Sequence, residues 1–265
     1  MKEKTKSTIY HDKIAAEYEE GYKDPYWQLY FQVTWHNLKK YLPGTKGARV
    51  LDAGGGTGMW SRVLAREGFK LVCADVSEKM LEVGRKLAKD EVLEGSVEFK
   101  IVDITDMSCF DDSTFDMVIS QGDPVGYCDN PQEAVNELSR VAKEGAHVSV
   151  SVDSFYSQFG GLLARGDFKQ LDSLLKTHVT EFDGFYPQYN FTVDELVELL
   201  ENAGLRVVDV IGKTVFTRFF PKEKLNELLS DKEFFNKMLD MENNYNNEPT
   251  IVGLSGHIQA IGRKM

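Results

Sequence analysis

A cluster of glycines follows Asp52 and gives the first indication of a ligand site. Gly54, Gly55, Gly56 and Gly58 join an apolar run to a stretch with helical spacing. Glycine has no Cβ atom, so the backbone of such a turn can approach a ligand closely. In a doubly wound sheet this turn borders the crevice beyond the carboxyl ends of the strands, where ligands bind. We therefore expect a ligand to lie against this loop.

Acidic residues follow the next two apolar runs. Asp75 ends the first, at a position where a carboxylate can accept hydrogen bonds from both hydroxyls of a ribose. Asp103 ends the second, where it can accept from the amino group of adenine while Ile104 packs on the ring. Each aspartate alone could equally be a cap or a solvated loop residue. Together with Asp52 and the glycines, they predict one extended adenosine-containing ligand.

The loop departs from the G-x-G-x-x-G fingerprint of dinucleotide enzymes. Met59 occupies the third glycine position when the pattern is counted from Gly54. Asp52 instead opens a D-x-G-x-G-x-G pattern, and its carboxylate can hold loop amides or repel a phosphate. A ligand without phosphate is therefore the preferred interpretation.

Residues after Ser120 are candidates for the substrate side of the site. Gln121 can reach the amino-acid end of the ligand, and Asp123 or Tyr127 could hold or deprotonate a substrate, although an Asp-Pro turn is as often simple loop chemistry. His178 could act as a base, but we do not assign it that role. No catalytic residue is assigned. Five aromatic residues could line a substrate pocket or belong to the core: Trp27, Tyr156, Phe159, Phe185 and Tyr189.

Strand and helix patterns alternate around these residues. This alternation predicts an α/β, doubly wound, mainly parallel sheet that is covered on both faces. Two further helices are expected between Ile9 and Tyr41. The expected strands are 49–52, 71–74, 97–102, 115–119, 147–152, 205–211 and 254–261, and the expected helices are 59–67, 78–89 with Ser77 as N-cap, 131–143 and 192–203.

The chain is expected to form a single domain over residues 1–265. N-terminal helices occupy 1–44, the ligand-binding core occupies 45–153, and two insertions at 154–190 and 213–250 form a lid on the substrate side. The second insertion is predicted to be helical from Pro221, with a capping box formed by Ser230 and Glu233. Asn243 to Pro249 is expected to be a polar connection.

Composition excludes several classes of function. The chain has 42 acidic and 31 basic residues, and its net charge of -11 disfavours nucleic acid as a partner. It has no apolar stretch of 18 residues and no apolar signal segment at its start, so a cytoplasmic location is expected. Cys73, Cys109 and Cys128 fit neither a disulfide framework nor a zinc site, and the scattered histidines predict no bound metal.

The segment from Arg49 to about Ser154 resembles the core of class I S-adenosylmethionine-dependent methyltransferases, of the kind that act on ubiquinone, menaquinone and small molecules. The resemblance implies that the loop at 52–58 faces the methionine moiety, that Asp75 holds the ribose, and that Asp103 and Ile104 hold adenine. It also implies the strand order 3-2-1-4-5-7-6 with the last strand antiparallel. Residues 11–19 are similar to an N-terminal helix that closes over the cofactor, which makes Tyr18 a candidate and Tyr10 a weaker one.

The expected function is methyl transfer from S-adenosylmethionine to a small-molecule acceptor, by a monomer or homodimer. Asp123-Pro124 is followed by Val125-Gly126, which departs from the motif of amino-directed nucleic-acid methyltransferases. Three alternatives stay open: a nicotinamide-dinucleotide oxidoreductase, a non-catalytic S-adenosylmethionine-binding module, and an aminopropyl transferase, which would need an acidic acceptor channel. The candidate cofactor-binding residues are Tyr18, Asp52, Gly54, Gly55, Gly56, Gly58, Asp75, Val76, Met80, Asp103, Ile104 and Gln121.

Overall fold

A seven-stranded sheet organises the chain in the computed structural model, which describes residues 4–265. Its order is β3-β2-β1-β4-β5-β9-β8, and β9 runs antiparallel to both of its neighbours while the first five strands pair in parallel. This confirms the predicted order 3-2-1-4-5-7-6. The strands are β1 Arg49–Ala53, β2 Lys70–Asp75, β3 Val97–Ile101, β4 Phe115–Ser120, β5 Ala142–Asp153, β8 Leu205–Lys213 and β9 His257–Lys264.

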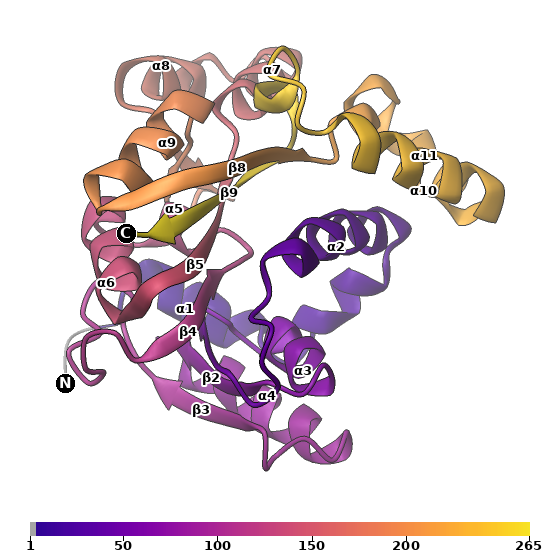
Figure 1. Cartoon of the computed structure of the whole chain (residues 1–265). Coiled ribbons are helices and arrows are strands. Elements are labelled where there is room, and N and C mark those ends of the chain that lie inside the picture. Colours follow the sequence, from indigo (N-terminus) through magenta and orange to yellow (C-terminus); the bar gives the residue numbers. More distant parts are fainter. Residues whose placement is uncertain (1–3) are drawn as a thin grey trace.

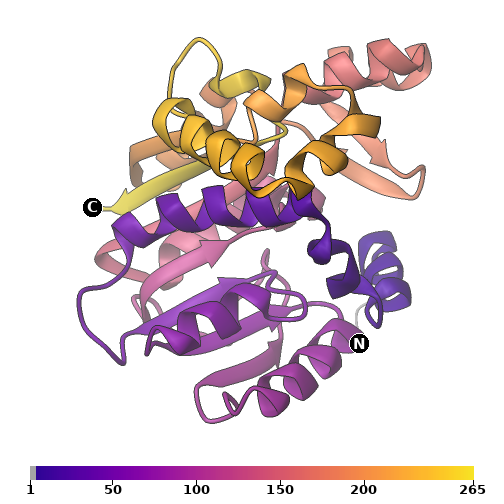
Figure 2. The same ribbon diagram turned by 90° about the vertical axis from the view of Figure 1, so that its right-hand side faces the viewer.

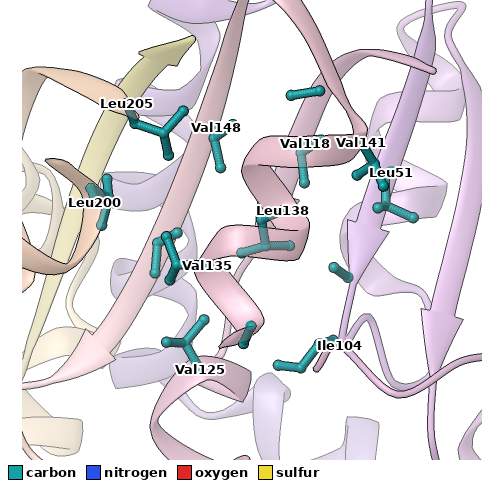
Figure 3. Close-up of a cluster of buried hydrophobic side chains, with 14 of the residues drawn as sticks. Leu51, Ile104, Val118, Val125, Val135, Leu138, Val141, Val148, Leu200 and Leu205 are labelled. Atoms are coloured by element: carbon teal, nitrogen blue, oxygen red, sulfur yellow. The ribbon is translucent and has the colours of Figure 1, made fainter. Parts of the chain in front are cut away.

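Helices cover both faces of this sheet, as Figure 1 shows. One face carries α2 Pro25–Leu38, α3 Met59–Arg66 and α4 Glu78–Asp90, and the other carries α5 Pro124–Tyr127, α6 Pro131–Val141 and α9 Val193–Asn202. The central strands are buried on both sides, which is why they read as continuous apolar runs. Figure 3 shows the core on the second face, where Leu138 of α6 and Leu200 of α9 pack toward Val148 of β5.

The predicted helix caps are largely present. The Ser77 hydroxyl accepts a hydrogen bond from the Met80 amide at the start of α4, and Thr192 with Glu195 forms the capping box of α9. The capping box predicted at Ser230 is wrong, because Asp231 is the N-cap of α11 Lys232–Tyr245. Ser230 instead ends α10 Lys222–Ser230.

Three predicted boundaries are also wrong, and at the first of them strand pairing overrides local spacing. The helix expected to reach Lys143 ends at Val141, and β5 begins at Ala142, which pairs with Phe115 of β4. The last strand begins at His257 instead of Leu254, since a 3-10 turn, η4, occupies Val252–Leu254. Similarly, α11 continues to Tyr245 through part of the expected polar connection.

The first insertion contains two helices and a hairpin that the sequence patterns do not predict. Its elements are α7 Phe155–Arg165, α8 Phe168–Thr177, β6 Val179–Phe182 and β7 Tyr186–Tyr189. Asp183 and Gly184 both have positive φ, and the Phe185 amide donates to the Phe182 carbonyl. These are the features of a type I′ turn, for which Asp-Gly is a strong sequence signal.

The second insertion packs against α2. It comprises η3 Phe216–Phe219, α10 and α11, and a buried cluster joins it to the chain's N-terminal region, with Leu29 and Val33 of α2 against Leu225 and Met238. Figure 2 shows α2 running across this side of the molecule beneath α10, in orange, and α11, in gold.

The predicted N-terminal helices are α1 Lys6–Ile14 and α2, with an additional 3-10 segment, η1 Tyr18–Lys23, between them. Across residues 4–265, every helix is too short or too polar to cross a membrane.

Candidate functional site

The glycine loop after β1 is held in a conformation that requires glycine. Gly54, Gly56 and Gly58 have φ values of +72°, +56° and +73°. A Cβ atom on Gly54 would also lie 2.3 Å from the Cβ of Pro124. The amides of Gly54 and Gly55 donate to the Ala74 carbonyl at 2.7 and 3.0 Å, so the loop is fastened to the end of β2.

Asp52 lies behind this loop. Its Oδ2 accepts hydrogen bonds from the Ser61 amide at 3.1 Å and the Ser61 hydroxyl at 2.7 Å. Burial raises the pKa of Asp52 to about 6. The loop amides that we expected Asp52 to hold are bonded elsewhere, and this carboxylate instead orients the first turn of α3. Gly58 also faces the interior, where a Cβ atom would meet the Phe99 ring at 2.9 Å.

Asp75 closes the loop from the neighbouring strand. Its Oδ2 accepts a hydrogen bond from the Gly56 amide at 2.9 Å, and its Oδ1 accepts from the Ser77 amide at 2.8 Å. Each oxygen retains further acceptor capacity, and the residue lines the pocket above the loop. Burial raises the pKa of Asp75, opposed by these two amide hydrogen bonds.

Asp103 and Gln121 lie at the other strand ends. Asp103 accepts hydrogen bonds from the amide and hydroxyl of Thr105, at 3.0 and 2.7 Å. The Gln121 side chain donates to the Ser149 hydroxyl at 2.9 Å and accepts from the Gln259 side chain at 3.2 Å. These contacts fix both side chains at the carboxyl edge of the sheet.

The strand ends and the loop surround one pocket. Asp52 and Gly58 support the pocket from behind. The candidate residues that line it are Tyr18, Gly54, Gly55, Gly56, Asp75, Val76, Met80, Asp103, Ile104 and Gln121.

The N-terminal segment closes the pocket from above. The Ser77 hydroxyl donates to Asp12 of α1 at 2.6 Å. Glu19 of η1 accepts from the Thr57 hydroxyl at 2.6 Å and pairs with the buried guanidinium of Arg62 at 2.8 Å. No role for Asp12 or Glu19 is predicted from the sequence. Their partners lie far along the chain, and no local sequence pattern connects them.

Tyr18 and Tyr22 form the inner surface of this cover. Their hydroxyls lie 3.0 Å apart, and both rings line the pocket together with Thr5, Ser7 and His11. Tyr18 therefore lines the pocket above the glycine loop. Tyr10 faces away from this pocket and contacts the β6–β7 hairpin, with its ring 5.6 Å from Phe182 and 5.5 Å from Tyr186.

A second, larger chamber adjoins the first pocket. The two share a wall made of His11, Tyr18, Tyr22, Tyr30, Gly122 and Tyr127. The β6–β7 hairpin and α1 lie on the same side of the molecule and form the outer wall of the chamber (Figure 2). The chamber is therefore positioned to hold a substrate beside whatever occupies the first pocket.

Two buried carboxylates lie at the floor of the chamber. His257 Nε2 is 3.2 Å from Asp123 Oδ2 and 3.4 Å from Asp153 Oδ1, and the Tyr127 hydroxyl donates to Asp153 at 3.0 Å. Burial, and then the charge of Asp123, raise the pKa of Asp153 well above its usual value. Burial lowers the pKa of His257. Asp123 and Tyr127 are predicted candidates, whereas Asp153 and His257 are not predicted from the sequence.

A buried lysine lies below this floor. Lys213 donates to the Tyr30 hydroxyl and, at 2.6 Å, to the Ser151 hydroxyl, which in turn donates to Asp123 at 2.6 Å. Burial lowers the pKa of Lys213 to about 8. The lysine thus supports Asp123 through Ser151.

The other predicted substrate-side residues are dispersed. Trp27 lines the chamber, whereas Tyr156, Phe159, Phe185 and Tyr189 are not among its lining residues. His178 caps α8 and lies 2.7 Å from Glu195, away from the floor. The aromatic lining residues that were not predicted from the sequence are Tyr22, Tyr30 and the hairpin pair Phe182 and Tyr186.

Sequence comparison matches the part of the chain that carries the glycine loop, Asp75 and Asp103 to a methyltransferase family. A model described as a methyltransferase domain matches residues 50–145. A demethylmenaquinone methyltransferase from Clavibacter sepedonicus is 44% identical over 106 residues, which cover 39% of this chain and only 40% of that relative. A ubiquinone/menaquinone biosynthesis C-methyltransferase from Idiomarina loihiensis is 31% identical over 185 residues, covering 64% of this chain and 70% of that relative.

More distant similarity extends over nearly the whole chain. A tRNA 5-carboxymethoxyuridine methyltransferase from Escherichia coli is 22% identical over 259 residues, covering 96% of this chain and 95% of that relative. The structure of an S-adenosylmethionine-dependent methyltransferase from Methanosarcina mazei has a TM-score of 0.61 at 20% identity, covering 86% of this chain and 97% of that one. This structural likeness shows a shared fold.

Proposed function

This chain belongs to the S-adenosylmethionine-dependent methyltransferases, and we propose that its methyl acceptor is a small molecule held in the second chamber. The cofactor supplies an electrophilic methyl group on a sulfonium centre. The protein therefore has to hold the cofactor, align the acceptor with the methyl group and exclude water.

The first pocket suits a cofactor that carries no phosphate. The amides of Gly54 and Gly55 are bonded to Ala74, the amide of Gly56 to Asp75, and the amide of Gly58 to the Gly55 carbonyl. These four donors are therefore not free to bind a pyrophosphate, which argues against the dinucleotide alternative. Asp75 and Asp103 would also repel one.

In the proposed complex the backbone of the glycine loop lies against the methionine moiety, and Gln121 faces its amino-acid end. The free acceptor capacity of Asp75 receives the ribose hydroxyls, with Val76 and Met80 beside the sugar. Asp103 and Ile104 hold the adenine ring. Tyr18 covers the cofactor from the side of η1, and every one of these residues lines the same pocket.

The observation that carries a small acceptor is the position of the chamber beside the cofactor pocket. Its lining comes from the N-terminal segment, the strand ends and the hairpin, and it shares a wall with the cofactor pocket. The net charge of -11 opposes a nucleic-acid acceptor. Acidic residues line the chamber, as an aminopropyl transferase would require. Membership of the methyltransferase family nevertheless favours methyl transfer over aminopropyl transfer.

Two measurements test this proposal. Calorimetry with S-adenosylmethionine, its decarboxylated form and NAD separates the cofactor alternatives, and we expect the intact methionine cofactor to bind most tightly. Incubation with methyl-labelled cofactor, a metabolite extract and bulk tRNA then identifies the acceptor class. Label in the low-mass fraction supports the proposal, whereas label in tRNA contradicts it.

A further inference from the structure

Two buried carboxyl groups meet at the chamber floor. Asp123 and Asp153 both flank His257, and Lys213 supplies one buried positive charge through Ser151. Burial lowers the pKa of His257, which favours its neutral form. The charge of Asp123 contributes to the raised pKa of Asp153, and the charges of both Lys213 and Arg218 act on His257 between the two carboxylates. A positively charged ligand at this floor would relieve their mutual repulsion.

Acidic residues also dominate the outer part of the chamber. Asp167, Glu181 and Asp183 line it, against a single arginine, Arg165. Charges of one sign around a cleft attract ligands of the opposite sign and raise their local concentration. Entry of a cation is favoured over entry of a carboxylate or phosphate.

Aromatic rings provide the side walls. Tyr22, Trp27 and Tyr30 form a continuous set, with ring centroids 5.6 Å apart for the first pair and 5.2 Å for the second. Tyr127 and Tyr186 face the chamber from α5 and the hairpin, with centroids 5.5 Å apart. The faces of such rings attract ammonium groups, especially where water is excluded.

One buried hydroxyl in this wall lacks a partner. Tyr186 is 2% exposed, and its hydroxyl makes no hydrogen bond to the described part of the chain. A buried polar group without a partner is costly, and such groups are usually completed by a ligand or water. The hydroxyl oxygen can accept a hydrogen bond from an N–H group in the chamber.

We propose that the acceptor is an aliphatic amine, which enters as an ammonium ion and binds between the Asp123–Asp153 pair and the aromatic wall. The inference rests on the function proposed above and adds the acceptor atom, nitrogen. Tyr186 and the carboxylates receive its N–H groups, and the shared tyrosine wall directs its nitrogen toward the methyl group.

The reaction then requires one proton transfer and one substitution. Asp153 takes a proton from the ammonium ion and so exposes the nitrogen lone pair. That pair forms the new bond to the methyl carbon as the carbon–sulfur bond breaks, and the electrons of the broken bond leave on sulfur. The products are a methylammonium ion and a neutral thioether, and the proton on Asp153 passes to solvent. Burial raises the pKa of Asp153, which makes it a stronger base than an exposed carboxylate.

The same floor could be considered for a metal ion. Asp123, Asp153 and His257 each offer one ligand atom, and these atoms lie within 4.8 Å of one another. However, the ammonium of Lys213 lies behind Asp123 through Ser151, and a fixed positive charge opposes a divalent cation more strongly than a singly charged ammonium ion.

Chemical blocking of amines tests this inference even while the acceptor is unidentified. A metabolite extract is divided, and one half is treated with acetic anhydride and then hydroxylamine, so that amines stay acetylated while hydroxyls are restored. Both halves are incubated with methyl-labelled cofactor. We expect the acetylated half to lose at least nine-tenths of the labelled product. Label that survives acetylation overturns the amine assignment but leaves small-molecule methylation intact, and label in neither half contradicts both proposals.

Two variants test the assigned residues with the acceptor identified in this way. Tyr186→Phe is expected to raise KM for the amine about tenfold while kcat changes less than threefold, because the ring stays and only the acceptor oxygen is lost. Tyr245→Phe, at a half-exposed tyrosine on α11, is the matched control and should change neither. Asp153→Asn should lower kcat at least a hundredfold, with cofactor affinity unchanged by calorimetry.

Equal behaviour of Tyr186→Phe and Tyr245→Phe would refute the placement of the amine beside the hairpin. Loss of activity on treatment with EDTA, restored by one divalent metal, would overturn the ammonium site in favour of a metal site. If Asp153→Asn fails to fold, as judged by its thermal transition, the Tyr186 pair and the chelator experiment still decide the outcome.

Discussion

Replacement of Asp75 by alanine tests the cofactor site most directly. The wild-type carboxylate bridges the Gly56 and Ser77 amides and faces the pocket with its remaining acceptor capacity. Asp75→Ala removes the proposed acceptor of both ribose hydroxyls. Since burial raises the pKa of this carboxyl, its removal also relieves a desolvation cost, and we expect the variant to fold.

Asp75→Ala removes two proposed hydrogen bonds from the ribose hydroxyls to a charged carboxylate, and each such bond contributes about 1.5–3 kcal/mol. Water can compensate part of this loss in the variant, so we expect a net cost of roughly 2–4 kcal/mol, or about 30- to 1000-fold in Kd. Calorimetric titration with S-adenosylmethionine measures the change. Asp90→Ala, at the exposed end of α4, is the control and should bind normally. An unchanged Kd for a folded Asp75→Ala protein would refute the assignment of the pocket.

Three further perturbations have distinct outcomes. Gly54→Ala should lower Tm by several degrees and abolish measurable cofactor binding, because a Cβ atom would overlap Pro124 at a φ of +72°, whereas Gly44→Ala, in open space, should do neither; equal Tm values would contradict the loop argument. Glu19→Gln should speed cofactor release at least threefold in stopped-flow experiments, since it weakens the pairing with Arg62 that holds η1 over the loop; unchanged release would show that η1 is no barrier. Burial raises the pKa of Glu242 to about 7 from an ordinary value of 4.5, so the folded state retains a proton that the unfolded state loses and stability falls as pH rises through this window. The Tm of the wild type should therefore drop relative to Glu242→Gln between pH 5 and pH 8, and parallel Tm curves would refute the shift.

The residues that line the pocket proposed for the cofactor could be named from the sequence because their determinants are local. Each strand that ends at the pocket is an apolar run, and the residue that follows it must lie at the carboxyl edge of a parallel sheet. Asp75, Asp103 and Gln121 therefore meet although the chain between them is long. The loop glycines could be recognised because positive φ values leave few other residue types.

The acceptor chamber could not be predicted in the same way. Its floor joins Asp123 after β4, Asp153 at the end of β5, Lys213 at the end of β8 and His257 at the start of β9. Because β9 runs antiparallel between β5 and β8, its first residue, His257, lies at the same sheet edge as the last residues of those two strands, Asp153 and Lys213. Sequence spacing carries no trace of that pairing.

Binding of an ammonium ion beside the sulfonium of the cofactor would bring two positive charges together, and nearby carboxylates can offset their repulsion. An ammonium ion and the sulfonium of the cofactor both carry positive charge, and two unit charges about 4 Å apart repel by roughly 4 kcal/mol at an effective dielectric constant near 20. Carboxylates beside the acceptor offset this repulsion while the ion binds, and proton transfer to one of them removes the charge before attack. Lys213 lies behind Asp123 through Ser151 and offsets part of its charge. We therefore assign most of this role, and the proton transfer, to the second carboxylate, Asp153.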